Sequence, residues 1–465
     1  MLLVVRTPAT LNRLTDLIPA LTSDNRLEVC FTVDEGSYFS AGLTERLRNS
    51  GALIVPWASV GMQKFDVAIA ASDNTELHLL DAPVILIPHG AGYHRRSESG
   101  ISGLRREGLM WGGEPVPHTL ALAHLGQLST VAAIDPRLAE RALVIGDTTR
   151  DRLVAAAARR HLYRADDRRL VLIGSTWGKQ SLFGRDLELA ARLTQILPYD
   201  EFQLVMTLHP NVWAGHGELQ VRAWLRPATD AGVRLLSSEE DWRPALVAAD
   251  VVLSDHGSLT CYAAELGVPT ALAADGGTEV VPGSPLATLR DALPRFTGAL
   301  PDLPPPAVDL FAHPGQALNH LLERIYQILE LQPTTRHRPA MLPIPEFTAD
   351  RPKSFQVTVH NGRIQRLPVS DEDCHHLAAA EDVDELSILE KAAAIWSRTS
   401  FDTAEQACEW AAATLRRNPG ARVACAPAGG ELLAVIRDGG ERIITGTTDR
   451  SLAASIAYRD HLSRS

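Results

Sequence analysis

The sequence predicts an α/β fold in which two doubly wound sheets follow one another and a smaller α+β region ends the chain. Short apolar stretches alternate with helical stretches from residue 1 to about 150, and a second alternation begins at Arg168. Such alternation is typical of parallel strands whose connecting helices cover both faces of a sheet. Ligands of these sheets bind beyond the carboxyl ends of the strands, so we expect a cleft where the two sheets face each other.

The length of the chain indicates about three domains. It has 465 residues, of which 45% are hydrophobic and 22% charged, a composition typical of a soluble globular protein. We predict a first sheet over residues 1–150, a second over 151–331 and a small α+β region over 354–465. Five prolines between them indicate a linker over 332–353.

Charge and cysteine content exclude several classes of protein. The net charge of −11 argues against a broad nucleic-acid-binding surface. No apolar run is long enough for a signal or membrane-spanning segment, which predicts a cytoplasmic protein. The cysteines form no CxxC motif or Cys/His cluster, so we expect buried thiols, no metal site and no cofactor. They are Cys30, Cys261, Cys374, Cys408 and Cys425.

The first half contains seven stretches with the apolar character of strands, separated in several places by helical stretches such as 10–21 and 41–51. The strand candidates are 2–7, 27–33, 52–57, 66–71, 83–90, 119–126 and 141–147. In the second half, strands are expected at 168–178, 202–210, 249–257 and 269–274, with an unassigned region that contains 232–238 and helices at 186–197, 241–249 and from Ser258.

The last third contains fewer signals. A helix over 315–331 has an apolar stripe at helical spacing, which we interpret as core. A hairpin is expected over 354–367 around Asn361-Gly362, then a helix over 405–417, turn-linked strands over 422–446 and a final helix. This region has no catalytic signature.

The stretch from Val251 to Leu272 contains the strongest candidate for a binding site. An apolar strand ends at a sharp turn with Ser254, Asp255 and Gly257, and a helix begins at Ser258. Small residues let backbone N–H groups point outward, and a helix N-terminus carries partial positive charge, so the junction suits a phosphate or diphosphate. The alternative is an ordinary strand-turn-helix unit.

Together, the two doubly wound halves and the Ser-Asp-x-Gly-Ser turn, followed by Leu-Gly-x-Pro at 266–269, resemble the GT-B fold. Within it, the chain resembles the CDP-glycerol glycerophosphotransferases and the hydrolysing UDP-N-acetylglucosamine 2-epimerases over roughly residues 1–330. One departure concerns the helix after the turn. Both families have carboxylates there that are expected to hold ribose hydroxyls, whereas this chain has Cys261 and Tyr262, and Glu265 comes later.

The resemblance implies two catalytic histidines. Pro88-His89-Gly90 is similar to the His-Gly of the glycerophosphotransferases, which implies that His89 is the general base and that Gly90 belongs to the same site. Leu208-His209-Pro210 resembles the His-Pro after the second strand of the other half, which implies that His209 donates to a phosphoryl oxygen. For both histidines the alternative is a turn residue satisfied by backbone groups.

Two further matches are partial. Ser175 to Lys179 resembles the Pro-Thr-Trp-Arg of the glycerophosphotransferases, which implies that Thr176 and Lys179 contact the phosphates, with Lys179 supplying the missing charge. The alternative is a capped helix start with Trp177 packed in the core. The stretch Gly146 to Leu153 resembles a motif at the exit from the first domain, where we expect a structural role in which Asp151 caps the following helix.

The long irregular segment after His89 is rich in cations. We interpret these side chains as binding an anionic acceptor or a diphosphate, with a solvated loop as the alternative. They are His94, which replaces the family's lysine, Arg95, Arg96, Arg105 and Arg106.

These patterns predict a metal-independent transferase. A CDP- or UDP-linked donor would bind near Ser258 and His209, a hydroxyl acceptor would enter from the first sheet, and His89 would take its proton. A UDP-sugar 2-epimerase and a non-catalytic nucleotide- or anion-binding scaffold are the alternatives. The sequence leaves the donor base, the acceptor and a homodimer open.

Overall fold

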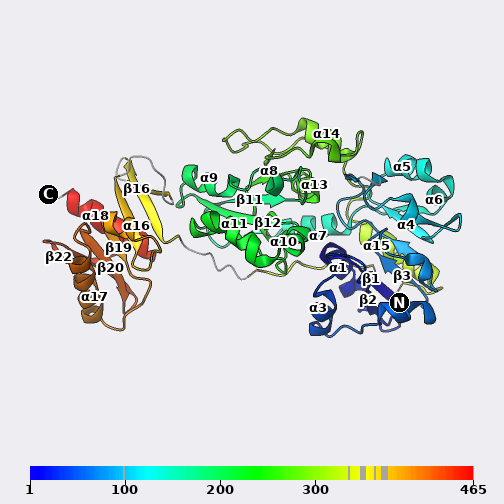
Figure 1. Ribbon diagram of the computed structural model, residues 1–465, viewed down its shortest axis with the longest axis horizontal. Helices are drawn as coiled ribbons and strands as arrows, with labels where there is room; N and C mark the ends of the chain where they lie inside the picture. Colours follow the sequence, from blue (N-terminus) through cyan, green and yellow to red (C-terminus); the bar gives the residue numbers. More distant parts are fainter. Residues whose placement is uncertain (98–99, 334–335, 346–351, 361–362, 368–374, 464–465) are drawn as a thin grey trace. The chain divides into compact units, whose positions relative to one another are not determined.

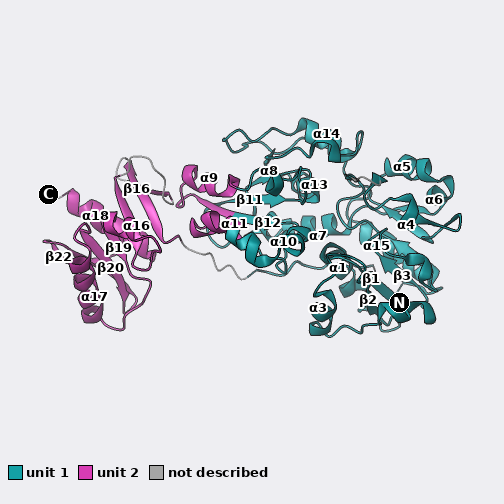
Figure 2. Ribbon diagram, viewed as in Figure 1, with its two compact units in different colours: residues 1–187, 205–223, 236–346 teal, residues 188–204, 224–235, 347–465 magenta. Residues whose placement is uncertain are grey.

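The computed structural model describes residues 1–97, 100–333, 336–345, 352–360, 363–367 and 375–463. The chain divides into two compact units (Figure 2). Unit 1 comprises residues 1–187, 205–223 and 236–346, and unit 2 comprises residues 188–204, 224–235 and 347–465. The three domain boundaries expected from the sequence, at 150/151, 331/332 and 353/354, remain predictions.

The first sheet has six strands, all parallel, in the order β10-β9-β4-β3-β1-β2 (Figure 1). The order reverses between β1 and β3, the point at which doubly wound sheets bind ligands. The candidate at 52–57 forms no strand, and only Ile54 makes an isolated parallel bridge, to Phe31. The strands are β1 (Leu2–Val5), β2 (Cys30–Val33), β3 (Ala68–Ala70), β4 (Val84–Leu86), β9 (Thr119–Leu122) and β10 (Ala142–Val144).

The second sheet repeats this plan, with the order β13-β12-β11-β14-β15. The chain order reverses between β11 and β14, and β11, β14 and β15 pair in parallel. The fold class predicted from the sequence, two tandem doubly wound sheets followed by a smaller region of helices and strands, is therefore confirmed. The strands are β11 (Arg169–Ser175), β12 (Phe202–Leu208), β13 (Arg234–Leu235), β14 (Val251–Ser254) and β15 (Thr270–Leu272).

Helices connect these strands, and two short hairpins lie in the segment after β4. The helices are α1 (Pro8–Thr15), α2 (Ile18–Leu21), α3 (Leu43–Asn49), α4 (Arg106–Leu109), α5 (Gln127–Ile134), α6 (Pro136–Glu140), α7 (Thr148–Ala157), α8 (Leu182–Arg185), α9 (Leu189–Ile196), α10 (Pro210–His216), α11 (Glu218–Asp230), α12 (Arg243–Ala248), α13 (Ser258–Glu265) and α14 (Pro285–Ala292). The hairpins are β5 (Arg96–Ser97) with β6 (Gly100–Ile101), and β7 (Met110–Trp111) with β8 (Glu114–Pro115).

Helix α15 (Ala317–Ile328) returns to the first sheet late in the sequence (Figure 1). Its apolar stripe, including Leu321 and Ile325, packs in one core with Leu3 and Ile69 of the central strands. Asp151 does not cap its own helix α7, where Asp147 is the cap residue. Instead its carboxylate accepts N–H groups at the start of α15, so the expectation of a local cap was wrong.

Part of the predicted linker packs into unit 1. Leu342 is 3% exposed and belongs to the core of the second sheet. Tyr163 donates to its carbonyl, and Arg152 donates to the carbonyl of Ala340. The segment 336–345 is therefore part of the packing of unit 1.

The C-terminal part of unit 2 is a seven-stranded sheet in the order β17-β16-β18-β19-β20-β21-β22. Only β18, β19 and β20 pair in parallel, and helices cover both faces. Its elements are β16 (Ser354–His360), β17 (Arg363–Leu367), β18 (His376–Ala380), α16 (Leu386–Lys391), β19 (Ala394–Trp396), α17 (Ala404–Arg417), β20 (Val423–Ala428), β21 (Glu431–Ile436), β22 (Gly440–Ile444) and α18 (Arg450–Leu462).

The expected hairpin forms between β16 and β17, although its turn residues Asn361 and Gly362 lie outside the described residues. Three cysteines are buried and Cys408 is half-buried, all four as free thiols, whereas Cys374 lies outside the described residues. Within the described part of the chain, every helix is too short or too polar to cross a bilayer.

Unit 2 also contains a buried arginine that joins distant segments. Arg366 of β17 is 3% exposed and donates to the carboxylate of Asp200, which precedes β12. Its carbonyl accepts the N–H of Tyr199, and the Tyr199 ring packs on Phe355 with a centroid distance of 5.1 Å. The turn at 199–200 is thus part of the C-terminal region's packing.

Candidate functional site

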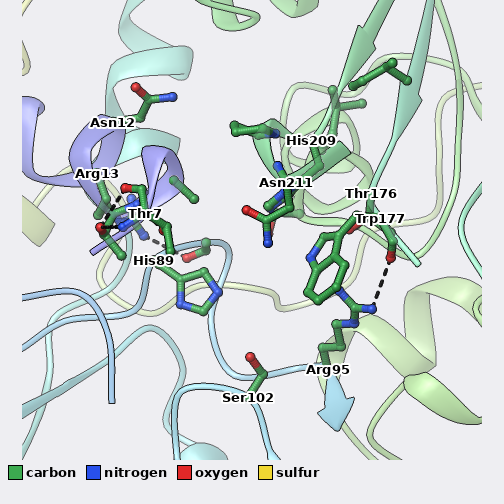
Figure 3. A pocket seen from close by; sticks show the side chains of 18 of the residues that line it. Thr7, Asn12, Arg13, His89, Arg95, Ser102, Thr176, Trp177, His209 and Asn211 are labelled. Atoms are coloured by element: carbon green, nitrogen blue, oxygen red, sulfur yellow. Dashed lines mark hydrogen bonds between the residues drawn. The ribbon is translucent and has the colours of Figure 1, made fainter. Parts of the chain in front are cut away.

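A cavity of about 1090 Å³ lies within unit 1, at the carboxyl ends of both sheets. Residues that follow β1 and β4 line one side, and residues that follow β11, β12 and β14 line the other. Figure 3 shows Arg13 and His89 on one side and His209, Asn211 and Trp177 on the other. Each sheet contributes its topological switch point, which is where the fold is expected to bind a ligand.

His89 follows β4 and extends its imidazole into the cavity (Figure 3). His89 is exposed and lines the cavity. Desolvation by the surrounding protein lowers the pKa of His89 below 6.5, and the positive charges of Arg13 and Arg95 add to the effect. Asp73 acts in the opposite direction. His89 is therefore a neutral imidazole at neutral pH, the form that accepts a proton.

His209 lies at the start of α10 and is also neutral. Burial is the main cause that lowers the pKa of His209 to about 3, and His89, once protonated at low pH, and the positive charge of Arg95 act in the same direction. The backbone N–H of Asn211 donates to its Nδ1 at 3.1 Å. A neutral His209 accordingly has its proton on Nε2 and offers a donor to a ligand in the cavity.

The low pKa values of buried histidines predict that the fold becomes less stable in acid. Burial also lowers the pKa of His94 to about 4. Both His94 and His209 have pKa values below the unfolded value near 6.5, so below pH 6.5 the unfolded state binds more protons and the fold loses stability. We expect the free energy of unfolding to fall, between pH 6.5 and 4, by on the order of 1 kcal/mol per pH unit for each histidine. Urea titrations of wild type and His209→Asn check this, because the variant should lose stability less steeply. Equal slopes would contradict it.

The Asp255 carboxylate occupies much of the turn that the sequence suggested for phosphate. Asp255 is fully buried. It accepts the N–H groups of Thr176, Leu182 and Gly257 at 2.9, 2.8 and 3.0 Å, and the Ser175 hydroxyl at 3.1 Å. This carboxylate satisfies donors from β11, α8 and the turn after β14, so Asp255 holds the turn together, and it also lies on the lining of the cavity.

Asp255→Asn is expected to destabilise the protein by roughly 3 kcal/mol. The amide NH₂ would face N–H donors and leave at least one of them buried without an acceptor. Chemical denaturation of the variant measures this cost. The matched control is Asp309→Asn, since Asp309 is an 84% exposed carboxylate in unit 1 and should change stability by less than about 0.5 kcal/mol. A near-neutral Asp255→Asn would show that the carboxylate is dispensable.

The N-terminus of α13 forms the other part of this turn. The helix has eight residues and no side-chain cap, and the N–H groups of a first helical turn are donors of the kind that bind anions. Ser258 Oγ accepts the N–H of Ala91 at 3.0 Å and keeps its own hydroxyl hydrogen to donate. A Cβ on Gly90 would lie 2.5 Å from Ser258 Oγ, so this approach requires glycine. The His89 loop and the α13 N-terminus are thus in direct contact. Ser254 is 1% exposed, and its hydroxyl oxygen accepts a hydrogen bond from the hydroxyl of Thr260.

Arg95 bridges the two sides of the cavity. Its guanidinium stacks over Trp177 at 4.4 Å from the ring centroid and donates to the Trp177 carbonyl at 3.1 Å (Figure 3). It also pairs with Glu279, which contacts His256 Nε2 at 3.1 Å. Glu279 therefore orients Arg95, and the guanidinium places positive charge on the cavity wall.

The other predicted cations divide into two groups. His94 and Arg96 line the cavity, but His94 is a buried neutral imidazole that contacts the Ala91 carbonyl at 2.9 Å. Arg105 instead pairs with Asp73 and Arg106 with Asp135, and neither lines the cavity. Lys179 is exposed and also lies outside the lining, whereas Thr176 belongs to it.

The departures on α13 have a structural explanation. Cys261 is fully buried, and Tyr262 stacks between Trp242 and Phe311 while donating to Asp147 at 3.2 Å. Glu265 pairs with Arg150 at 2.9 Å. The helix positions expected to hold ribose hydroxyls therefore form core and ion-pair contacts.

The sequence analysis missed Arg13, Asp16 and Arg243. Asp16 is buried and pairs with Arg152 and Arg243, and Arg243 lines the cavity. No motif distinguishes these residues, because each is an isolated charge on an amphipathic helix or a turn. Among the described residues, no group of three or more His, Cys, Asp or Glu side chains is arranged to hold a metal ion.

Two doubly wound sheets whose carboxyl ends border one cavity define a protein of GT-B type. No family model and no curated protein matches the chain. Similar solved structures include the wall teichoic acid polymerase TagF, with 12% identity, 58% of this chain and 69% of that chain covered, and a TM-score of 0.39.

Two others are MnaA of S. aureus solved with UDP and the UDP-GlcNAc 2-epimerase of Methanocaldococcus jannaschii. The first has 12% identity, covers 74% of this chain and 99% of that chain, and has a TM-score of 0.45. The second has 13% identity, covers 58% and 82%, and has a TM-score of 0.38. Likeness at this level leaves the activity of this chain open.

Proposed function

We propose that the protein is a transferase that moves a glycosyl or polyol-phosphate group from a CDP- or UDP-linked donor to a hydroxyl acceptor. The observation that supports this most directly is the contact between the His89 loop and the α13 N-terminus, through Ala91 N–H and Ser258 Oγ. A base and an anion-binding helix end border one cavity, as transfer from an activated phosphate donor requires.

The reaction would divide its chemistry between the two sheets. Neutral His89 removes the proton of the acceptor hydroxyl while the oxygen forms the new bond to the transferred group. The bond to the leaving phosphate breaks, and its negative charge develops near the α13 N–H groups, His209 Nε2–H and Arg95. These groups would stabilise the charge without a metal, so turnover is expected to persist in EDTA.

The carboxylates of the cavity leave the epimerase alternative open. Asp16, Asp255 and Glu279 are each held by several donors or cations, whereas the exposed Glu239 also lines the cavity. A binding scaffold stays open because α13 offers no carboxylate to a ribose.

Thermal-shift screening tests the proposal. The protein is incubated with CDP, UDP and their sugar and alditol conjugates, and a ligand at 100 times its Kd stabilises the fold by about 2.7 kcal/mol. A stabilising donor is then incubated with hydroxyl acceptors. Release of a nucleoside monophosphate indicates polyol-phosphate transfer, and release of a diphosphate indicates glycosyl transfer. Stabilisation by UDP-N-acetylglucosamine with interconversion of sugars would instead establish an epimerase, and no response to any nucleotide would favour the scaffold.

A further inference from the structure

Arg13 is a buried cation whose contacts surround His89. It lies in the last turn of α1 and is 5% exposed. Its Nε donates to the carbonyl of Pro88 and its Nη2 to the carbonyl of Gly90, each at 2.8 Å. These are the carbonyls of the residues before and after His89, so one guanidinium holds the backbone on both sides of the imidazole.

The other face of the same guanidinium contacts the start of α7. Arg13 forms an ion pair with Asp147, the cap residue of α7, and donates to Thr149 Oγ1 at 2.6 Å. Asp147 also accepts the hydroxyl of Tyr262 on α13. The His89 loop is therefore fixed relative to both helices that follow it in the cavity wall.

We propose that Arg13 is a positioning residue for His89, holding the loop through the carbonyls of Pro88 and Gly90 so that the imidazole faces the α13 N-terminus. This inference rests on the proposed role of His89 as the base. A planar guanidinium can donate to two carbonyls and a carboxylate at once, whereas a lysine ammonium is a single point charge without this fork. The hydrogen-bonding geometry of Arg13 and its positive charge can therefore be tested separately by mutation.

Arg243 supplies a matched control. It is also largely buried and pairs with Asp16 and Asp241, but it makes no hydrogen bond to the His89 loop. It is also absent from the charges that shift the pKa of His89. The two pairs to be compared are Arg13 with Asp147 and Arg243 with Asp241. Each joins a largely buried arginine to a carboxylate of unit 1. Only loss of the Arg13 pair should alter His89.

The charge is tested with the double variants R13M/D147N and R243M/D241N, which leave Asp16, the partner of Arg152 and Thr149, in place. The pH dependence of diethyl pyrocarbonate modification, quantified on the peptide that contains His89, reports the pKa of that imidazole. The charged groups that act on it are Asp73, Arg13 and Arg95, with His209 nearby. Removing Arg13 is expected to raise the midpoint by about half a pH unit, while R243M/D241N matches wild type. An unchanged midpoint in a folded R13M/D147N would overturn the inference.

The geometry is tested with R13K and R243K, which keep their charges. In R13K the His89 midpoint should stay at the wild-type value, but hydrogen exchange of the Ala91 amide should be about tenfold faster because the loop loses hydrogen bonds. R243K should leave that amide unchanged, and wild-type exchange in R13K would also overturn the inference. Neither measurement uses a substrate, so a wild-type protein that accepts no donor would reject the transferase and leave these results standing.

Discussion

His89→Gln is expected to lower turnover by about 100- to 10,000-fold while leaving donor binding nearly unchanged. Glutamine has a similar polar shape but cannot accept a proton at neutral pH, so it removes base catalysis alone. His89 extends into the cavity and makes no hydrogen bond within the described chain that the fold would lose. The measurement is product release with the donor found by thermal shift, together with the shift itself as a readout of binding.

The control is His118→Gln. His118 is exposed and lies outside the cavity lining, so both readouts should match wild type. Turnover of His89→Gln within tenfold of wild type would reject His89 as the base. Loss of the donor-induced shift would instead assign His89 to binding.

Gly90→Ala is expected to destabilise the protein by about 1–3 kcal/mol and to abolish most turnover. The new Cβ would lie 2.5 Å from Ser258 Oγ, so either the Ser258 side chain rotates and loses its hydrogen bond from Ala91 N–H, or the His89 loop and the α13 N-terminus move apart. Chemical denaturation measures the first effect, and product release measures the second. Donor binding should weaken as well, because the same movement displaces the first turn of α13.

Two comparisons isolate this clash. Ser258→Gly in the Gly90→Ala background removes the overlapping atoms, so the double variant should recover much of the stability. Gly215→Ala is the matched control, because Gly215 lies within α10 and its added Cβ would meet only Phe39, at 3.8 Å. That substitution should be neutral or slightly stabilising. A double variant as unstable as Gly90→Ala would show that the cost arises elsewhere.

The sheets were predictable because their strands are apolar runs bounded by turn residues. Such runs report burial directly, and the alternation with helices then dictates parallel pairing. The run at 52–57 is the exception, because Pro56 lacks an N–H and only Ile54 pairs. Strands β18 and β19 were missed because alanine, which dominates 378–380 and 392–394, has little preference for strands.

The site was predictable only where a residue follows directly on a strand. His89, His209 and Ser258 each follow the carboxyl end of a strand, and all three line the cavity. Arg13 was not predictable, because its partners Pro88 and Asp147 lie 75 and 134 residues away. The role of Asp255 was also hidden, since a motif shows which residue occupies a turn but not whether its carboxylate already satisfies the turn's donors.

The contact between Arg366 and the turn at 199–200 determines how the chain can be shortened. A protein that stops before residue 352 would lose Arg366 and Phe355, leaving Asp200 without its guanidinium and the Tyr199 ring without its packing partner. The C-terminal sheet expressed alone would lack the Asp200 carboxylate, which leaves buried Arg366 with Asp449 as its ion-pair partner and without the hydrogen bonds to Asp200. Fragments cut at the proline-rich segment are therefore expected to aggregate, and attempts to purify the cavity-bearing part should retain the full chain.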